Sequence, residues 1–391
     1  MLRKRVVVPT TSSRIVYLCD WLPPDYGAVG QYATIAARKL AFEGNDVVLG
    51  GLSSKAERET EEVLGQGKLK TRAIVASSYE KQRFFRRIFW TIATNTRLTL
   101  QFWGDLRRSN EIVFTGSPPL LLHWIAPANL ILRKRLIYRI TDFHPECLMA
   151  ASASPSIVLR ALFALTLFWR RRIDGFEVLG EDQRVRLQAI GIDPAKIVLK
   201  RDASPVPVST DTLPLTRPAD TDGKLLLLYS GNWGVAHDVE TFVEAYRWHH
   251  RQGSGRFVLW LNAVGANAGN VEAALVKDGL PHIRTKPVPL EELAALLVTP
   301  DAHLITLSDA YVGYVLPSKV YGCIASGLPI LYVGSEKSDV HLLCSEAPPV
   351  GYTRVGVGDV RDCAAALERM ADRIQERTLG AGAKSSDRVD L

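Results

Sequence analysis

The sequence predicts an α/β fold with two doubly wound parallel-sheet domains, and three observations predict it. The chain has 391 residues, more than the roughly 250–300 residues that one hydrophobic core spans. Short, nearly continuous apolar runs alternate with amphipathic stretches, a pattern typical of parallel strands that are covered on both faces. A polar segment rich in proline divides this alternation into two halves.

The strands that we expect are short runs rich in β-branched residues. Before the dividing segment they are Arg14–Cys19, Asp46–Gly50, Glu111–Phe114, Leu136–Ile140 and Gly175–Leu179. After it they are Leu225–Tyr229, Phe257–Leu261, Ala302–Leu307 and Pro329–Val333. Helices are expected between them, among them Gln31–Glu43, Val239–His250 and Leu290–Leu297. The order strand, helix, strand implies right-handed crossovers in open sheets.

The dividing segment sets the expected domain boundaries. We place an N-terminal domain at residues 1–203, a linker at 204–222 and a second domain at 223–375. The linker is polar and carries Pro205, Pro207, Pro214 and Pro218. Residues 376–391 are mostly small or charged, and we expect a disordered tail there.

Composition excludes several protein classes. With 47% apolar and 23% charged residues, the chain is not disordered as a whole. It has 5 cysteines and no Cys-x-x-Cys pair, which argues against a disulfide scaffold and a zinc site. The longest apolar run, Ile157 to Trp169, contains Arg160 and is shorter than the roughly 20 residues that span a bilayer. No signal-peptide core follows the basic start. We therefore expect a cytoplasmic protein without a metal site.

The loop after the first strand carries Gly27 and Gly30 just before a helix. Backbone N–H groups at a helix start can face an anion such as a phosphate. Alternatively, the two glycines only let the loop turn tightly. Their spacing is not the Gly-x-Gly-x-x-Gly fingerprint, which argues against a dinucleotide cofactor.

A second glycine-bearing loop, residues 230–238, follows the strand Leu225–Tyr229. Gly231 and Gly234 permit close approach to a ligand, and Asp238 is placed to cap the next helix. Two such loops, one in each domain, suggest a nucleotide diphosphate held in a cleft between facing domains. We interpret His237 as a loop or interface histidine.

The third loop leads into a predicted helix with Ser318 as its N-cap and Gly327 at its end. Lys319 then lies in the first turn, where a cation is unfavourable unless an anion sits beside it. The alternative is a solvated surface lysine.

The stretch from residue 81 to 108 is basic and aromatic, with Asp105 as its single acid. Such a helix suits the headgroup region of an anionic membrane. A core-facing helix with a solvated basic face is the alternative. Nucleic acid is not expected as a partner, because no recognised module accompanies the charge. The candidate membrane contacts are Arg83, Phe84, Arg86, Arg87, Phe89 and Trp90.

Together these pieces resemble glycosyltransferase family 4, enzymes of the GT-B fold, and especially its bacterial exopolysaccharide and capsule branch. Four motifs occur in the family's order between about residues 14 and 370. They are Pro23-Pro-Asp-Tyr-Gly-Ala-Val-Gly, Thr141-Asp-Phe-His-Pro-Glu, Tyr229-Ser-Gly-Asn-Trp-Gly-Val-Ala-His-Asp and Pro317-Ser-Lys-Val-Tyr-Gly-Cys-Ile-Ala-Ser-Gly-Leu-Pro.

The resemblance implies two facing Rossmann-like domains and a hexosyl transfer with retention of configuration. The donor would be a nucleoside-diphosphate sugar, and the acceptor a saccharide, in particular one linked to a polyprenyl lipid, in surface polysaccharide synthesis. No metal or other cofactor is implied, and the enzyme would sit peripherally on the inner face of the cell membrane. The implied catalytic residues are Lys319, Asp142 and Glu146. The implied donor-binding residues are Gly27, Gly30, Gly231, Asn232, Trp233, Pro317, Ser318, Lys319 and Tyr321.

The sequence also departs from the family. Asn232 and His237 stand where many members carry an Arg and a Lys that contact the diphosphate, and Gly322 replaces a glutamate. A catalytically silent scaffold of the same fold therefore stays open, as does a sugar-nucleotide epimerase. An NAD-linked dehydrogenase is a weaker third alternative.

Overall fold

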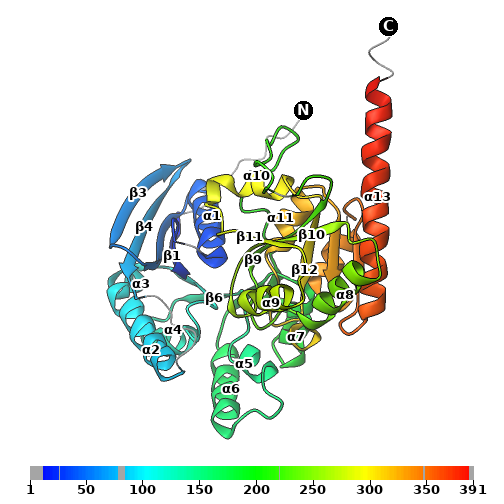
Figure 1. Ribbon diagram of the computed structural model, residues 1–391. Coiled ribbons are helices and arrows are strands. Elements are labelled where there is room, and N and C mark those ends of the chain that lie inside the picture. Colours follow the sequence, from blue (N-terminus) through cyan, green and yellow to red (C-terminus); the bar gives the residue numbers. More distant parts are fainter. Residues whose placement is uncertain (1–11, 26, 78–83, 220, 347, 387–391) are drawn as a thin grey trace, which may run out of the picture. The chain divides into compact units, whose positions relative to one another are not determined.

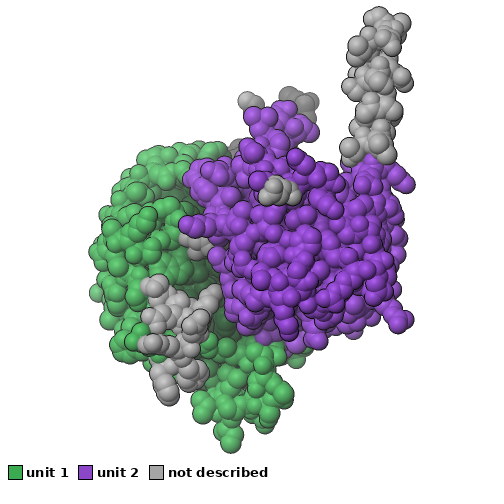
Figure 2. Space-filling model, in the orientation of Figure 1, with its two compact units in different colours: residues 1–179, 184–201 green, residues 180–183, 202–391 purple. Residues whose placement is uncertain are grey.

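A computed structural model describes residues 12–25, 27–77, 84–219, 221–346 and 348–386. The chain forms two compact units, shown in green and purple in Figure 2. Unit 1 comprises residues 1–179 and 184–201, and unit 2 comprises residues 180–183 and 202–391. Each unit is built on one sheet, and the two are described separately below.

Unit 1 contains an 8-stranded sheet in the order β3-β4-β2-β1-β5-β6-β7-β8. Its neighbouring strands are parallel except for β3, which runs antiparallel to β4 at one edge. The strands are β1 (Arg14–Trp21), β2 (Asp46–Ser53), β3 (Arg58–Leu64), β4 (Gly67–Val75), β5 (Glu111–Thr115), β6 (Arg135–Ile140), β7 (Gly175–Val178) and β8 (Ile197–Leu199).

Alternate residues of the central strands are buried on opposite faces of this sheet. Tyr17 and Val47 pack with α1 on one face, whereas Leu18 and Gly50 contact Phe102, at the end of α2, on the other. Burial on both faces explains why these strands read as continuous apolar runs. The helical elements of unit 1 are α1 (Ala28–Phe42), α2 (Phe84–Gln101), α3 (Trp103–Arg108), α4 (Leu122–Leu132), α5 (Glu146–Ala150), α6 (Ile157–Arg170), α7 (Glu181–Ala189) and the 3-10 turn η1 (Pro194–Lys196).

Unit 2 contains a 6-stranded, fully parallel sheet in the order β11-β10-β9-β12-β13-β14. Its strands are β9 (Leu225–Asn232), β10 (Phe257–Val264), β11 (His282–Arg284), β12 (Ala302–Thr306), β13 (Ile330–Val333) and β14 (Thr353–Val355). Its helical elements are α8 (Glu240–Arg251), α9 (Ala266–Lys277), η2 (Leu290–Glu292), α10 (Leu293–Val298), η3 (Asp309–Tyr311), α11 (Lys319–Ala325), α12 (Asp339–Glu346) and α13 (Val360–Ser386).

Both faces of this second sheet are also covered. Leu227, Leu259 and Leu261 pack against α8, α9 and α13 in the larger core, which includes Phe242 and Leu367. The alternate side chains, such as Leu228 and Trp260, pack on the other face with α10. The expected α/β class with two parallel sheets is confirmed, and each strand predicted from the sequence is present with shifts of a few residues at its ends.

Five strands were not predicted: β3, β4, β8, β11 and β14. Edge strand β3 is mostly charged, because its side chains face solvent, and its partner β4 mixes basic with apolar residues, so neither reads as a continuous apolar run. The other three have 3 residues each. Such short strands leave too little periodicity to be recognised.

The segments expected to be a linker and a tail both belong to unit 2. The described residues of 204–222, which are all but residue 220, form no helix or strand, and Leu215 N–H donates to Thr299 Oγ1 (2.8 Å) while Arg217 pairs with Asp301 (2.7 Å). Residues 376–386 of the expected tail continue α13, which projects beyond the sheet of unit 2 in Figure 1, and residues 387–391 lie outside the described residues. The first part of α13 is held in the core, and a helix that is already nucleated extends readily.

Candidate functional site

The loop that follows β9 in unit 2 is organised by Trp233. This indole is fully buried and stacks on the Tyr229 ring at a centroid distance of 3.7 Å, and its Nε1–H donates to the Asp238 carbonyl (3.3 Å). Its backbone N–H donates to Val264 O (2.6 Å), and its carbonyl accepts from Asn267 N–H (2.9 Å). Every polar group of Trp233 is therefore used within the protein. The expected role of Trp233 in donor binding is corrected to a core role.

Gly231 and Asn232 lie at the exposed end of the same strand. Gly231 has φ of 102°, a conformation that favours glycine. The Asn232 side chain is exposed and lies against Gly265, where an added Cβ would be 2.2 Å from Asn232 Oδ1. A glycine at 265 thus makes room for the Asn232 amide, which stays a candidate ligand contact.

Lys319 places an ammonium group inside unit 2. Its Nζ lies 3.1 Å from the centroid of the Tyr229 ring, has no access to solvent and makes no hydrogen bond within the described part of the chain. Burial lowers the pKa of Lys319 well below its usual value, and the Cys323 thiol opposes this shift only in part. A buried cation without a carboxylate partner is costly unless an anion joins it.

His237 and Thr306 lie next to this ammonium. His237 Nδ1 is 2.5 Å from the Thr306 carbonyl, and since a carbonyl only accepts, Nδ1 carries the proton. Burial and the charge of Lys319 lower the pKa of His237 to about 3, so the ring is neutral at pH 7. The Thr306 hydroxyl is buried without a hydrogen-bond partner. Sequence reasoning missed Thr306, because it only ends an apolar strand and belongs to no motif.

The remaining expected donor residues of unit 2 lie around the start of α11. Pro317 and Tyr321 are buried, and Ser318 is half-buried. Ser318 stands at the predicted N-cap position, but its side chain makes no capping hydrogen bond. Lys319, the first residue of α11, places its buried ammonium among them.

In unit 1, Gly30 is required by packing. A Cβ at Gly30 would lie 1.7 Å from the carbonyl oxygen of Trp21, so only glycine lets α1 approach the end of β1. Gly27 has no such constraint, since an added Cβ would be 3.5 Å from the nearest atom and its φ of 178° is ordinary extended backbone. Close packing on Trp21 thus explains the glycine at position 30, and the phosphate interpretation stays a prediction for both Gly27 and Gly30.

Two carboxyl groups gather at the carboxyl edge of the first sheet. Asp20 ends β1, Ser117 follows β5, and Asp142 follows β6, and these three strands are neighbours. Ser117 Oγ donates to Asp20 Oδ2 (2.7 Å), whereas Asp20 Oδ1 is buried without a partner. Burial raises the pKa of both carboxyl groups to about 6, and the charge of Asp20 adds to the shift at Asp142. Sequence reasoning found Asp142 but missed Asp20.

Glu146 forms a buried ion pair. Both of its oxygens accept from the Arg170 guanidinium, at 3.1 Å for the Oε2–Nη2 pair, and both side chains are almost inaccessible. Arg170 Nη2 also donates to His144 O (3.2 Å), so the pair fixes the loop that follows β6. Both oxygens of Glu146 thus bind Arg170, which gives Glu146 a structural role. Its expected catalytic role stays a prediction of the sequence.

Some of the expected membrane contacts on α2 are exposed, and others are buried. Trp90 is buried, and its Nε1–H donates to Ser77 O (2.8 Å), so it cannot reach a membrane and that prediction is corrected. Phe89 is largely exposed and Arg86 is exposed, whereas Arg87 is half-buried. Phe84 begins α2, and Arg83 lies outside the described residues.

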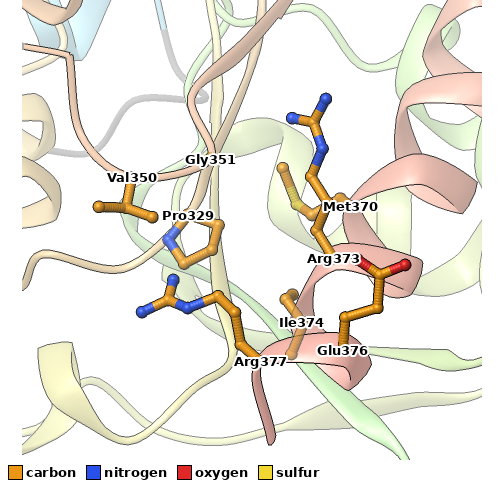
Figure 3. A pocket seen from close by; sticks show the side chains of 8 residues that line it. All are labelled: Pro329, Val350, Gly351, Met370, Arg373, Ile374, Glu376 and Arg377. Atoms are coloured by element: carbon orange, nitrogen blue, oxygen red, sulfur yellow. The ribbon is translucent and has the colours of Figure 1, made fainter. Parts of the chain in front are cut away.

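A small pocket elsewhere does not belong to these groups (Figure 3). It has a volume of about 220 Å³ and lies between α13 and the amino end of β13, where Pro329, Met370 and Arg377 contribute to its wall. This volume is below the roughly 300–1,000 Å³ of typical ligand pockets. Within the described residues, no group of three or more His, Cys, Asp or Glu side chains is placed to hold a metal ion.

Replacing Glu146 tests its structural role. We expect Glu146→Gln to lower the free energy of unfolding by about 3–5 kcal/mol, because it leaves Arg170 buried without a counter-charge. Glu59→Gln, which breaks the exposed pair with Lys70, should leave the free energy of unfolding close to that of the wild type. Urea denaturation of both variants measures the difference. Similar small losses in the two would show that the buried pair contributes little.

Replacing Asp142 tests whether its ionised carboxylate destabilises the folded state. The folded pKa of about 6 exceeds the unfolded value, so ionisation destabilises the folded state as pH rises through about 4 to 6. We expect Asp142→Asn to raise the free energy of unfolding by about 1–3 kcal/mol at about pH 7.5 and to change it little near pH 4. Denaturation at the two pH values measures this. A variant that is destabilised at both would mean that the carboxylate is stabilised by the fold.

Comparisons with known proteins agree with this architecture. No family model matches the chain. A probable glycosyltransferase of Pseudomonas aeruginosa, WbjE, is 25% identical over 308 residues, which cover 76% of this chain and 73% of that protein. The solved structures that are similar in fold include the following three. WaaG, a glycosyltransferase involved in lipopolysaccharide biosynthesis, has a TM-score of 0.60 at 13% identity and covers 91% of this chain and 90% of its own.

The second structure is sucrose-phosphate synthase from Thermosynechococcus elongatus, with a TM-score of 0.64 at 13% identity over 93% of this chain and 90% of that one. The third is HepE of Anabaena in complex with UDP-glucose, with a TM-score of 0.60 at 10% identity over 93% and 91%. These likenesses extend over both units. The chain therefore has the α/β architecture of the GT-B glycosyltransferase structures, with two parallel-sheet domains.

Proposed function

We propose that this protein is a glycosyltransferase that moves a hexosyl group from a nucleoside-diphosphate sugar to a saccharide, carried on a polyprenyl lipid, in surface polysaccharide synthesis. The observation that carries the proposal is the buried, unpaired ammonium of Lys319. A diphosphate beside Lys319 would supply the missing counter-charge. Membership of glycosyltransferase family 4 and of its exopolysaccharide branch stays a prediction of the sequence.

In this proposal Lys319 acts on the leaving group. The bond between the sugar C1 and the diphosphate oxygen breaks, and the diphosphate takes the electron pair. The acceptor hydroxyl oxygen forms the new bond to C1, and its proton passes to the oxygen of the leaving diphosphate. Retention of configuration is part of the proposal and rests on the family resemblance. A preorganised cation stabilises the developing charge on the leaving oxygen. Neutral His237 fits this arrangement, because a second cation there would compete for the same charge.

The similar proteins support the choice of donor. WbjE is named a probable glycosyltransferase, and HepE binds UDP-glucose in its structure. A putative UDP-N-acetylglucosamine 2-epimerase from Listeria monocytogenes shares the fold, with a TM-score of 0.53. An acceptor-dependent product therefore separates the proposed transferase from an epimerase or a silent scaffold.

The acceptor is proposed to bind at the carboxyl edge of the first sheet. Asp20 Oδ1 is buried without a partner, and Asp142 lies close enough for the two charges to interact. Carboxylate oxygens accept hydrogen bonds from sugar hydroxyls. Contact with an anionic membrane through Arg86 and Phe89 would bring a lipid-linked acceptor to the enzyme. Among the described residues, no helix has the length and apolar character needed to span a bilayer.

A donor screen tests the proposal. The protein is incubated with UDP-glucose, UDP-galactose, UDP-N-acetylglucosamine or GDP-mannose, together with polyprenyl-diphosphate-linked sugars, and nucleotide release and the glycolipid product are followed. We expect one donor to give a product that requires the acceptor. Tight binding of UDP or GDP without any product would favour the scaffold, and an epimerised nucleotide sugar would favour the epimerase.

Lys319→Met separates function from stability. We expect kcat/KM to fall roughly 10- to 100-fold, because one charged contact to the leaving group is lost. Removing a buried charge should raise the free energy of unfolding by about 1 kcal/mol at neutral pH. Since the folded pKa lies below the unfolded value of about 10.4, wild-type stability rises with pH in that window and the advantage of the variant shrinks.

Exposed Lys337 provides the control, because Lys337→Met removes a charge of the same sign without removing a buried one. It should leave both turnover and stability close to those of the wild type. Unchanged turnover in Lys319→Met would remove this residue from the mechanism. A destabilised Lys319→Met protein would mean that the ammonium is satisfied by the fold.

A further inference from the structure

Helix α6 exposes large apolar side chains at its amino end. Ile157 is 85% exposed and Val158 is 78% exposed, both in the first turn after the N-cap residue Ser156. In Figure 1, α5 and α6 project from the rest of unit 1, and the same region forms the green protrusion at the bottom of Figure 2. Two adjacent β-branched side chains that stay exposed forgo the favourable free energy of burial, and such exposed apolar groups often mark an interaction surface.

The exposed apolar surface continues along α6. Leu165 and Phe168 are also exposed, at 45% and 43%, and with Ile157 they follow the spacing of one helix face. The opposite face buries Thr166 and Arg170. The polarity of α6 is thus reversed relative to an ordinary surface helix, because apolar groups face outward and a charged group faces inward.

The charged residues of the chain segment that carries this face are all basic. No acidic residue occurs between Glu146 and Asp174, and Glu146 is paired internally with Arg170. Arg160 and Arg171 are exposed near the two ends of the helix. Arg172 lies over the Phe168 ring at 3.6 Å from its centroid. Apolar side chains ringed by arginines match the interior and the anionic headgroups of a bilayer.

The amino end of α6 also lies towards the carboxyl edge of the sheet in unit 1. A helix that connects parallel strands begins near the carboxyl end of the strand before it. Ile157 therefore lies towards the edge of the sheet where Asp20 and Asp142 gather, as does Phe89 in the first half of α2. Both α2 and α6 pack against α4. The two exposed apolar groups thus belong to one side of unit 1.

We propose that the α6 surface, defined as Ile157, Val158, Leu165 and Phe168 with Arg160, Arg171 and Arg172, docks unit 1 on an anionic lipid bilayer. The side chains of Ile157 and Val158 enter the boundary between headgroups and acyl chains, and the arginines contact lipid phosphates. That docking also presents a lipid-carried acceptor to the enzyme rests on the proposed function. The docking itself does not, and it is measured without any sugar transfer.

Vesicle sedimentation of the full chain tests the docking. The probe is vesicles of equal parts phosphatidylglycerol and phosphatidylcholine, with pure phosphatidylcholine as the uncharged comparison. We expect binding to the anionic vesicles that weakens as salt is added. The double variant Ile157→Ser/Val158→Ser should lower the partition coefficient roughly tenfold or more, because two apolar side chains no longer enter the lipid.

A matched control comes from another exposed apolar pair in the same unit. Phe42 is 69% exposed and Val63 is 72% exposed, but acidic residues adjoin them in the sequence: Glu43, Glu61, which pairs with Lys68, and Glu62, which pairs with Arg38. Phe42→Ser/Val63→Ser should leave vesicle binding unchanged. Equal losses in the two double variants, or no binding of the wild type at low salt, would overturn the proposal.

A charge variant tests the electrostatic part separately. Arg160→Gln/Arg171→Gln should weaken binding about fivefold per arginine at low salt and flatten the salt dependence. A variant that binds as well as the wild type would contradict the role of the arginines. The α6 surface could instead bind a second copy of the chain, and sedimentation equilibrium without vesicles tests for such a dimer. A dimer that the Ile157→Ser/Val158→Ser change abolishes would overturn the docking on lipid.

Discussion

Parallel strand pairing is the constraint on which the candidate site depends. In a parallel sheet all strands end at the same edge, so loops from distant parts of the sequence meet there. In unit 1 this edge brings Asp20 to Asp142, and in unit 2 it brings Tyr229 and His237 to Lys319. The sheets also contain buried polar side chains, such as Arg139 paired with Glu177 across β6 and β7. The candidate site residues lie at the ends of strands and in the loops that follow them, where the buried strands hold them in place.

The buried charged groups near these edges are of two kinds: some have a partner within the protein, and others have none. Arg170 and Glu146 are both buried, and each has its partner, so the pair serves the structure. Lys319 and Asp20 are buried as well, yet Lys319 Nζ and Asp20 Oδ1 have no hydrogen-bond partner in the described part of the chain. A fold optimised only for stability would not retain such groups, because each costs free energy that an apolar residue would not. Their cost is explained if a ligand of opposite or complementary polarity completes them.

The sequence predicted the fold class and most strands, because buried parallel strands leave continuous apolar runs that are easily recognised. It also predicted Lys319 as an unusual lysine from its position in a helix turn. It could not predict partners that depend on distance in three dimensions. Trp233 looked like a loop residue but fills the core, and Glu146 looked like a catalytic acid but meets Arg170, which is 24 residues away. Asp20 was missed because its neighbours Ser117 and Asp142 lie far along the chain.

Helix α6 shows why composition alone does not predict which face of a helix is exposed. Its apolar run is typical of a buried helix, and nothing in the sequence says which face turns inward. The orientation of the helix is set by Arg170, which pairs with buried Glu146. The side of the helix that carries Arg170 therefore faces the core. The apolar residues on the opposite side are then left outward. One buried ion pair thus fixes the loop that carries Asp142 and also orients Ile157 and Phe168 towards the surroundings, so the loop and the exposed face are two consequences of the same interaction.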